Sequence, residues 1–240
     1  MLMVNPLLGL YHIRAFGYSC YLLVDGDEAV LIDTGMWGSV RKIEALLELL
    51  DFEWLNLKAI LLTHGHIDHA CNAHTIASLS ECKVYIHRLE HAHLRGEYHY
   101  SKANRWCARG EALLRRFTHY TPATPDIYFQ DQDHLPFWGG LRVIHLPGHT
   151  TGHCGFYSEK HDILFAGDLF TYFLRPSLPP RSFCTAPWFL RESFDKVAAL
   201  DPSGILCAHS WHPNPEQTRK GFDSLYRRIC RGSICLPENK

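Results

Sequence analysis

The sequence has no long apolar run, no excess of charge of one sign and no linker-like segment. None of its hydrophobic stretches reaches the roughly 18 residues that a membrane-spanning helix needs, so we expect no membrane partner. Its 24 lysines and arginines balance 25 aspartates and glutamates, which gives a formal charge of -1. A chain without a global positive field is poorly suited to a polyanion. We therefore expect a small-molecule substrate and no nucleic-acid partner.

The cysteine pattern excludes two common kinds of small domain. The nine cysteines are scattered and odd in number, and no two of them form a Cys-x-x-Cys pair. Neither a disulfide scaffold nor a zinc ribbon has this pattern. The N-terminal segment has no basic residue ahead of its short apolar run, which argues against a secretory signal. We expect a protein of the reducing cytoplasm, and the sequence leaves its oligomeric state open.

The chain has the length and the pattern of one mixed domain. Its 240 residues, 46% of them hydrophobic, suit a single domain over 1–240 with a sizeable core. An Asp-Gly-Asp turn predicts a hairpin within 18–33, and a polar helical insert is expected at about 88–125. The remaining segments predict strands at 58–62, 83–86, 127–130, 141–146, 154–157, 163–166 and 204–207, helices at 39–50, 70–80, 190–200 and 215–230, and an irregular proline-rich surface loop at 175–187.

The strongest chemical signal is the segment Thr63-His64-Gly65-His66-Ile67-Asp68-His69, which directly follows a short apolar strand. Two imidazoles at i and i+2 of an extended segment project to the same side. Asp68 and His69, where the chain turns into a helix, can point to a neighbouring position, and both residue types ligate metals. One loop can thus feed two metals roughly 3.5–4 Å apart, the spacing of two-metal hydrolytic sites.

Three later residues of ligand type also stand just after predicted strands. They are His149 in Pro-Gly-His-Thr, Asp168 in Ala-Gly-Asp and His209 in Cys-Ala-His. Loops at strand ends are where a sheet presents functional groups, so these residues can converge on the histidine-rich segment. In this order the segments resemble the metallo-β-lactamase superfamily, whose His-x-His-x-Asp-His signature is intact at 64–69. Asp33, in an Asp-Thr-Gly turn after an early strand, matches a further position of that family.

The resemblance covers about residues 18–212 and implies an α+β fold. That fold is a four-layer αββα sandwich, in which two mixed β-sheets pack face to face with helices outside. Asp33 is then expected to orient metal ligands by hydrogen bonding, and Asp68 to take part in catalysis. The family's metal ligands correspond here to His64, His66 and His149 for a first metal, Asp68, His69 and His209 for a second, and Asp168 as the bridge between them.

By this resemblance the chain is a metal-dependent hydrolase with two divalent ions, zinc foremost and iron or manganese as alternatives. Water shared by two divalent cations loses its proton near neutral pH. The resulting hydroxide attacks an ester, thioester, lactone or amide bond of a small organic substrate, and Asp68 or the second metal assists the leaving group. Two alternatives stay open: a mononuclear iron oxidoreductase that uses oxygen on the same fold, and a non-catalytic metal-binding protein.

The segment after Asp168 departs from several branches of the family. It is Leu-Phe-Thr-Tyr, without the Gly-Cys-Gly-like turn of glutathione-thioester hydrolases, which argues against glutathione-linked substrates. Acyl-homoserine lactonases have a tyrosine three residues after the bridging aspartate. Thr171 occupies that position here, and Tyr172 follows one residue later. Asp168 and the missing signal peptide argue against β-lactamase activity. The aromatic residues considered for an apolar substrate pocket are Tyr172, Trp188 and Trp211.

Three further histidines have weaker signals. A helix could place His87 and His91 on one face as an accessory metal pair, although a solvated helix face is the more common explanation. His153 stands close to His149, where it can hydrogen-bond beside the site or fill a structural role at the start of a strand.

Overall fold

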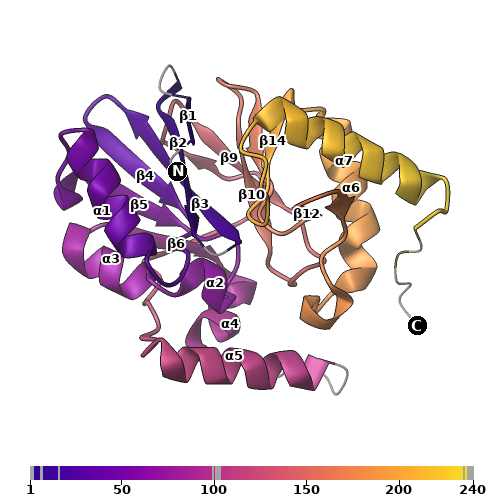
Figure 1. Ribbon diagram of the computed structural model, residues 1–240, viewed down its shortest axis with the longest axis horizontal. Helices are drawn as coiled ribbons and strands as arrows, with labels where there is room; N and C mark the ends of the chain where they lie inside the picture. Colours follow the sequence, from indigo (N-terminus) through magenta and orange to yellow (C-terminus); the bar gives the residue numbers. More distant parts are fainter. Residues whose placement is uncertain are drawn as a thin grey trace.

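The computed structural model describes residues 3–5, 8–15, 17–98, 100, 104–234 and 236, and it has four layers (Figure 1). Two β-sheets pack face to face in the middle, and helices cover both outer faces. This arrangement confirms the αββα sandwich expected from the sequence. The outer helices are α1 (Ser39–Leu49) and α3 (Ala73–Ser80) on one sheet, and α6 (Leu190–Leu200) and α7 (Pro215–Cys230) on the other.

The first sheet joins an antiparallel half to a parallel half. Its strand order is β1-β2-β3-β4-β5-β6-β7. Neighbours from β1 to β4 are antiparallel, and neighbours from β4 to β7 are parallel. The strands are β1 (Met3–Asn5), β2 (Leu10–Ala15), β3 (Tyr18–Asp25), β4 (Glu28–Ile32), β5 (Leu57–Leu61), β6 (Lys83–His87) and β7 (Ile127–Phe129).

The second sheet is also mixed and has the order β14-β11-β10-β9-β8. Its pair β11 and β14 is parallel, and the other neighbours are antiparallel. A separate two-stranded ribbon, β12 with β13, follows β11 along the chain. The strands are β8 (His134–Leu135), β9 (Leu141–His145), β10 (Cys154–Ser158), β11 (Ile163–Phe165), β12 (Thr171–Tyr172), β13 (Pro176–Ser177) and β14 (Gly204–Leu206).

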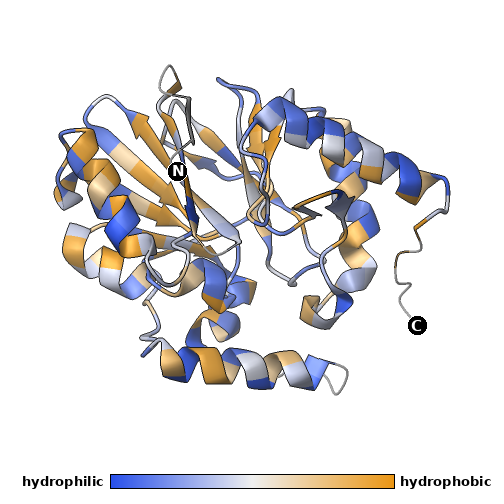
Figure 2. Cartoon of the chain, in the orientation of Figure 1, coloured by the Kyte–Doolittle hydropathy of each residue, from blue (hydrophilic) through white to orange (hydrophobic). Residues whose placement is uncertain are grey.

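Both faces of the central strands are buried, because each sheet lies between a second sheet and a helical layer. In β3, Leu22 faces the core under α1 and α3, while Tyr21 and Leu23 face the core between the sheets. In β5, Ile60 and Leu61 divide in the same way. Figure 2 shows the result, with apolar residues concentrated in the strands. This double burial explains why the sequence shows unbroken apolar runs rather than alternation.

Several boundaries differ from the sequence-based predictions. The expected helix at 70–80 is two helices, α2 (Ile67–Ala70) and α3, and the first begins inside the histidine-rich segment. The proline-rich stretch is not irregular throughout, since it contains β13 and a 3-10 turn at Arg181–Phe183. Strand β2 was not expected, because His12 and Arg14 interrupt its apolar pattern.

The insert after β6 is helical and lies outside the sheets, as expected (Figure 1). It contains a 3-10 turn at Arg88–Glu90, then α4 (His91–Arg95) and α5 (Arg105–Phe117). Part of it, residues 99 and 101–103, falls outside the described residues. None of the residues of α5 is buried.

The described residues include no disulfide and no helix of membrane-spanning character. All eight cysteines within the described part of the chain are free thiols. Among the described helices, none combines the length and the apolar character that crossing a membrane requires.

His12 predicts a loss of stability in mild acid. Burial, with a smaller effect of the Arg14 charge, lowers the pKa of His12 from 6.5 to about 4. Because the folded state has the lower pKa, its stabilising contribution is complete above 6.5 and is lost as the pH falls toward 4. In denaturant titrations, we expect the free energy of unfolding of His12→Gln to fall less between pH 7 and pH 5 than that of the wild type, by on the order of 2 kcal/mol. Equal losses in the two proteins would contradict this assignment.

Candidate metal centre

The site lies where strands of both sheets end at one edge. Strands β4 and β5 are parallel neighbours, so Asp33 and Thr63, which follow them, stand side by side. Strands β11 and β14 are also parallel neighbours and are followed by Asp168 and His209. The loop between β9 and β10 carries His149. It lies at the same edge, because β10 is antiparallel to β11 and begins where β11 ends. A hydrogen bond from the Cys154 N–H to the Thr63 carbonyl, 2.9 Å long, joins the loops of the two sheets.

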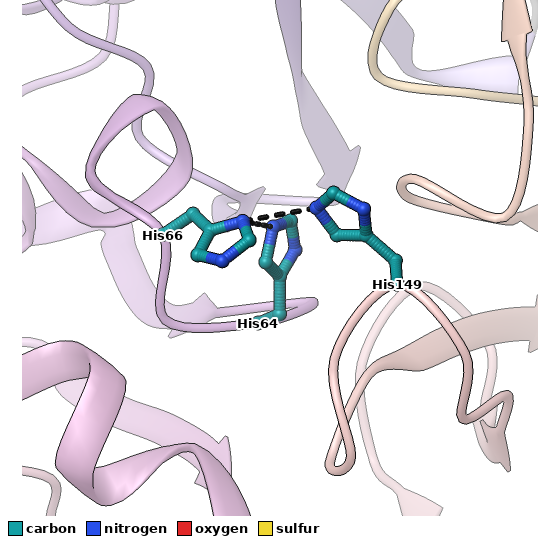
Figure 3. Close-up of side chains that lie close together, drawn as sticks. All are labelled: His64, His66 and His149. Atoms are coloured by element: carbon teal, nitrogen blue, oxygen red, sulfur yellow. Dashed lines mark hydrogen bonds between the residues drawn. The ribbon is translucent and has the colours of Figure 1, made fainter. Parts of the chain in front are cut away.

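Three imidazoles from two of these loops point at one another (Figure 3). The Nδ1 atom of His66 lies 3.1 Å from Nε2 of His64 and 2.9 Å from Nε2 of His149. All three side chains are buried. Burial holds the pKa of His64 and of His149 well below its usual range, so these rings stay neutral. A neutral imidazole is the form that donates a nitrogen lone pair to a metal.

A second group of donors lies beside the first. Nε2 of His209 is 3.2 Å from Oδ2 of Asp68, and Nε2 of His69 is 3.8 Å from the same oxygen. Asp68 and His69 come from α2, while His209 follows β14 in the other sheet. The two sheets therefore contribute donors to both groups.

Asp168 touches both groups. Its Oδ2 lies 3.3 Å from Nε2 of His149 and 3.3 Å from Nε2 of His209, while its Oδ1 lies 3.4 Å from Nε2 of His69. One carboxylate thus spans the space between the two sets of nitrogen donors. The sequence placed all seven of these residues in the site, and the structure brings all seven together.

The arrangement fits a divalent cation. Within the described residues, Nε2 of His69 and Oδ1 of Asp168 are buried and make no hydrogen bond. A buried polar atom without a partner costs roughly 1–3 kcal/mol, so such atoms normally have a reason to be there. Imidazole nitrogens and carboxylate oxygens are ligands that zinc and related metals accept. A cation between the two groups would satisfy both atoms at once.

The charges in the site are strongly coupled. Burial by itself raises the pKa of the Asp168 carboxyl, but His209, His69 and His149 outweigh it and hold that pKa well below its usual range. Burial by itself lowers the pKa of His69, but Asp168, Asp33 and Asp68 raise it well above its usual range. Protons and a metal cation therefore compete for the same nitrogen of His69.

Asp33 holds His69 from the side away from the other donors. It has a left-handed backbone conformation (φ 56°), which turns its buried carboxylate toward Thr63 and His69. Its Oδ1 accepts the Thr63 N–H at 2.8 Å, and its Oδ2 is 2.8 Å from Nδ1 of His69. The Nδ1–H of His69 donates to this carboxylate, which leaves Nε2 free to face the centre.

Three further residues support the ligand loops. Nδ1–H of His153 donates to the Leu146 carbonyl at 2.9 Å, and its Nε2 accepts the Asp168 N–H at 2.9 Å, so this histidine is structural and lies beside the site. Thr63 and Glu90 also contact the ligand loops, and the sequence analysis gave neither a role. Thr63 could have been suspected from its place directly before His64, whereas nothing in the sequence around Glu90 distinguishes it from a surface glutamate.

The three aromatic residues considered for a pocket have different surroundings. The ring of Tyr172 packs against Gly221 of α7 and against His212, and it is partly buried against the core under α6 and α7. Its place in a substrate pocket stays a prediction. Trp211 is 48% exposed and lies edge-on to Phe173, whose ring lies 6.4 Å from that of His209. Trp188 is partly exposed and lies against Phe189.

The accessory histidine pair does not form. His87 stacks on His145 of β9 with ring centroids 4.8 Å apart. Nδ1 of His91 is instead 2.6 Å from the hydroxyl of Tyr128. The two rings therefore have separate partners, and both residues have structural roles.

A cluster of histidines and aspartates at the edge of an αββα sandwich defines a metallo-hydrolase, as the sequence predicted. The family model described as the metallo-beta-lactamase superfamily matches residues 13–209, and the chain belongs to this superfamily. The match covers every residue of the site.

Relatives and solved structures agree with this membership. The chain is 27% identical over 221 residues to the probable metallo-hydrolase YflN of Bacillus subtilis (strain 168), covering 83% of this chain and 82% of that protein. It is 29% identical over 160 residues to the hydroxyacylglutathione hydrolase GloC of Haemophilus influenzae, covering 65% and 68%. A metallo-beta-lactamase family protein of Thermus thermophilus has a similar fold, with a TM-score of 0.74, 24% identity, and coverage of 93% of this chain and 80% of that one.

Replacing Asp33 is expected to weaken metal binding without unfolding the protein. In Asp33→Ala the ring of His69 loses the acceptor that fixes its orientation, and loss of such a partner lowers metal affinity by about 10- to 100-fold. Competition with a chromophoric chelator measures this affinity. Asp27→Ala, at an exposed turn, is the control and should bind as the wild type does. Wild-type affinity in a folded Asp33→Ala protein would exclude the orienting role.

Proposed function

We propose that this protein hydrolyses an ester, thioester, lactone or amide bond of a small organic molecule with two divalent metal ions, most simply zinc. The observation that carries the proposal is the position of Asp168. Its two oxygens lie within 3.4 Å of nitrogens from both donor groups. A carboxylate in that position suits a bridge between two cations, whereas a mononuclear site needs only one of the groups.

The seven residues divide into two ligand sets. We assign His64, His66 and His149 to one ion, and Asp68, His69 and His209 to the other, with Asp168 shared. Two divalent cations supply Lewis-acid polarisation of a carbonyl and activation of water near neutral pH. The donors match this use, because both sets offer imidazole nitrogens and the second set adds the carboxylate of Asp68.

Asp68 is the carboxylate best placed to move a proton. Its side chain is 30% exposed, whereas that of Asp168 is 5% exposed. Burial raises its pKa, but His69 and His209 outweigh the burial and keep the carboxyl ionised. An ionised carboxylate at the open side of the site can accept a proton at Oδ and return it to the leaving group.

The surroundings of His209 support an organic substrate with an apolar part. Phe173 and the exposed Trp211 form an aromatic pair on that side. Aromatic side chains contribute large apolar contact areas. The relative GloC is named for a thioester of glutathione, which supports thioesters among the candidate bonds. The segment after Asp168 lacks the turn associated with glutathione, so we propose a thioester or ester with a different carrier group.

Metal content and the bridging carboxylate provide the test. Plasma mass spectrometry of protein purified without added metal is expected to give about two zinc ions per chain. Asp168→Asn is expected to lose at least one ion and at least about 100-fold in kcat/KM against generic esters and thioesters, since losing an outer partner alone costs about 10- to 100-fold.

An exposed aspartate far from the donor groups provides the control. Asp51→Asn changes an exposed aspartate and should keep the wild-type metal content and activity. Full metal content and full activity in Asp168→Asn would refute the bridging role. About one iron per chain with little zinc in the wild type would favour oxygen-dependent chemistry on this fold.

A further inference from the structure

Glu90 is a buried carboxylate outside the metal-ligand set that contacts two ligand loops. It ends the 3-10 turn after β6, at the start of the insert, and its side chain has no exposed surface. Oε2 accepts the N–H of Gly65 at 2.9 Å, and Oε1 accepts the N–H of Gly152 at 2.8 Å. Both oxygens of one carboxylate are thus used by backbone groups of different loops.

Both glycines lie in loops that carry metal-ligand histidines. Gly65 stands between His64 and His66 in the loop that follows β5 of the first sheet. Gly152 stands in the loop between β9 and β10 of the second sheet, three residues after His149. Glu90 therefore links the two loops that supply the three histidines of the first donor set.

The contact leaves little room for adjustment. A Cβ atom on Gly65 would lie 2.7 Å from the Leu94 nitrogen and 2.9 Å from the Glu90 carbonyl oxygen. A Cβ atom on Gly152 would lie 2.8 Å from Oε1 of Glu90. The Gly65 loop thus packs so closely against segment 90–94, and the Gly152 loop against the Glu90 side chain, that neither glycine has room for a Cβ atom. A small displacement of Glu90 would change the spacing of His66 and His149, whose facing nitrogens are 2.9 Å apart.

Core packing alone does not explain a glutamate at this position. Burying a carboxylate is costly, and an apolar side chain would fill the same space without that cost. A carboxylate offers two oxygens in a fixed planar arrangement, which suits two N–H donors that approach from different loops. Burial raises the pKa of Glu90, while the Gly65 N–H donor and the nearby His66 act against that rise. A cation bound by His66 would favour the ionised carboxylate further.

We propose that Glu90 is a positioning residue that sets the separation of the loops bearing His64, His66 and His149 and thereby the affinity of that site for its metal ion. This inference rests on the proposed function, in which those three histidines hold one of two ions. It connects the insert to the metal centre, because the residue that spaces the ligands belongs to the segment that carries α4 and α5.

The test compares three variants during titration of the metal-depleted protein with cobalt(II). Glu90→Gln keeps the shape but turns an amide NH2 group toward one of the two N–H donors. Glu90→Asp keeps the charge but is one methylene too short to reach both loops. Glu111→Gln is the matched control, since Glu111 is a partly buried carboxylate of the same insert that bonds Arg115 and Tyr100 and no ligand loop.

We expect both Glu90 variants to bind one cobalt ion about 10- to 100-fold more weakly, with an altered visible absorption spectrum for that ion. The ion affected should be the one that His66→Ala loses, while the ion lost in His209→Ala keeps its affinity. Glu111→Gln should match the wild type. If Glu90→Gln does not fold, Glu90→Asp decides between the outcomes, since a role of charge alone predicts wild-type binding and a positioning role predicts weaker binding.

Two results would overturn the inference, and they differ from failure of the proposed function. Folded Glu90 variants with wild-type affinities and spectra for both ions would exclude a positioning role. Equal weakening of both ions, or the same loss in Glu111→Gln, would indicate a general effect on the fold. A wild-type protein that binds fewer than two cobalt ions would instead contradict the proposed dinuclear centre.

Discussion

Two β-sheets bury one another through a common apolar layer, and the position of the site depends on that contact. Tyr21 and Leu61 of the first sheet face Phe156 and Phe165 of the second in a single core. This packing sets the carboxyl ends of β4 and β5 opposite those of β11 and β14. It thereby brings five donors on loops and two donors on α2 to one place. Apolar burial is non-directional, but the registers of the strands convert it into a fixed spacing of polar groups.

Burying these polar groups together costs free energy, and residues outside the ligand set hold them in place by hydrogen bonds. Imidazole nitrogens that face one another, and carboxylates buried beside each other, interact unfavourably unless a proton or a cation lies between them. Asp33 holds His69, His153 holds the backbone of Asp168, and Glu90 holds the loops of His66 and His149. These hydrogen bonds use atoms that do not face the metal centre. The ligand side chains are therefore ordered before a metal ion binds. Preorganisation of this kind lowers the entropic cost of binding the metal and maintains the geometry during reaction.

The sequence revealed those parts of the site that are local or that follow a strand. His64 to His69 lie within one loop, and His149, Asp168 and His209 each follow a recognisable apolar run, so their type and place in the chain were sufficient. The packing of Tyr172 could not be predicted, because the sequence does not show that Gly221 of α7 leaves room for its ring. Glu90 was missed because its two partners are 25 and 62 residues away and are backbone N–H groups, which leave no trace in residue type.

The same long-range contacts show how one metal centre can be given different substrates. Asn104, at the start of α5, donates to the Cys184 carbonyl in the proline-rich segment at 2.8 Å, and the Thr185 N–H donates to the His149 carbonyl at 2.7 Å. The insert and the proline-rich segment are thus tied to each other and to the His149 loop. The aromatic pair Phe173 and Trp211 stands on the His209 side instead. These segments are tied to the ligand loops by the buried side chains of Glu90 and Asn104 and by backbone groups. Their exposed side chains can therefore change without moving a metal ligand, and specificity can diverge while the chemistry stays the same.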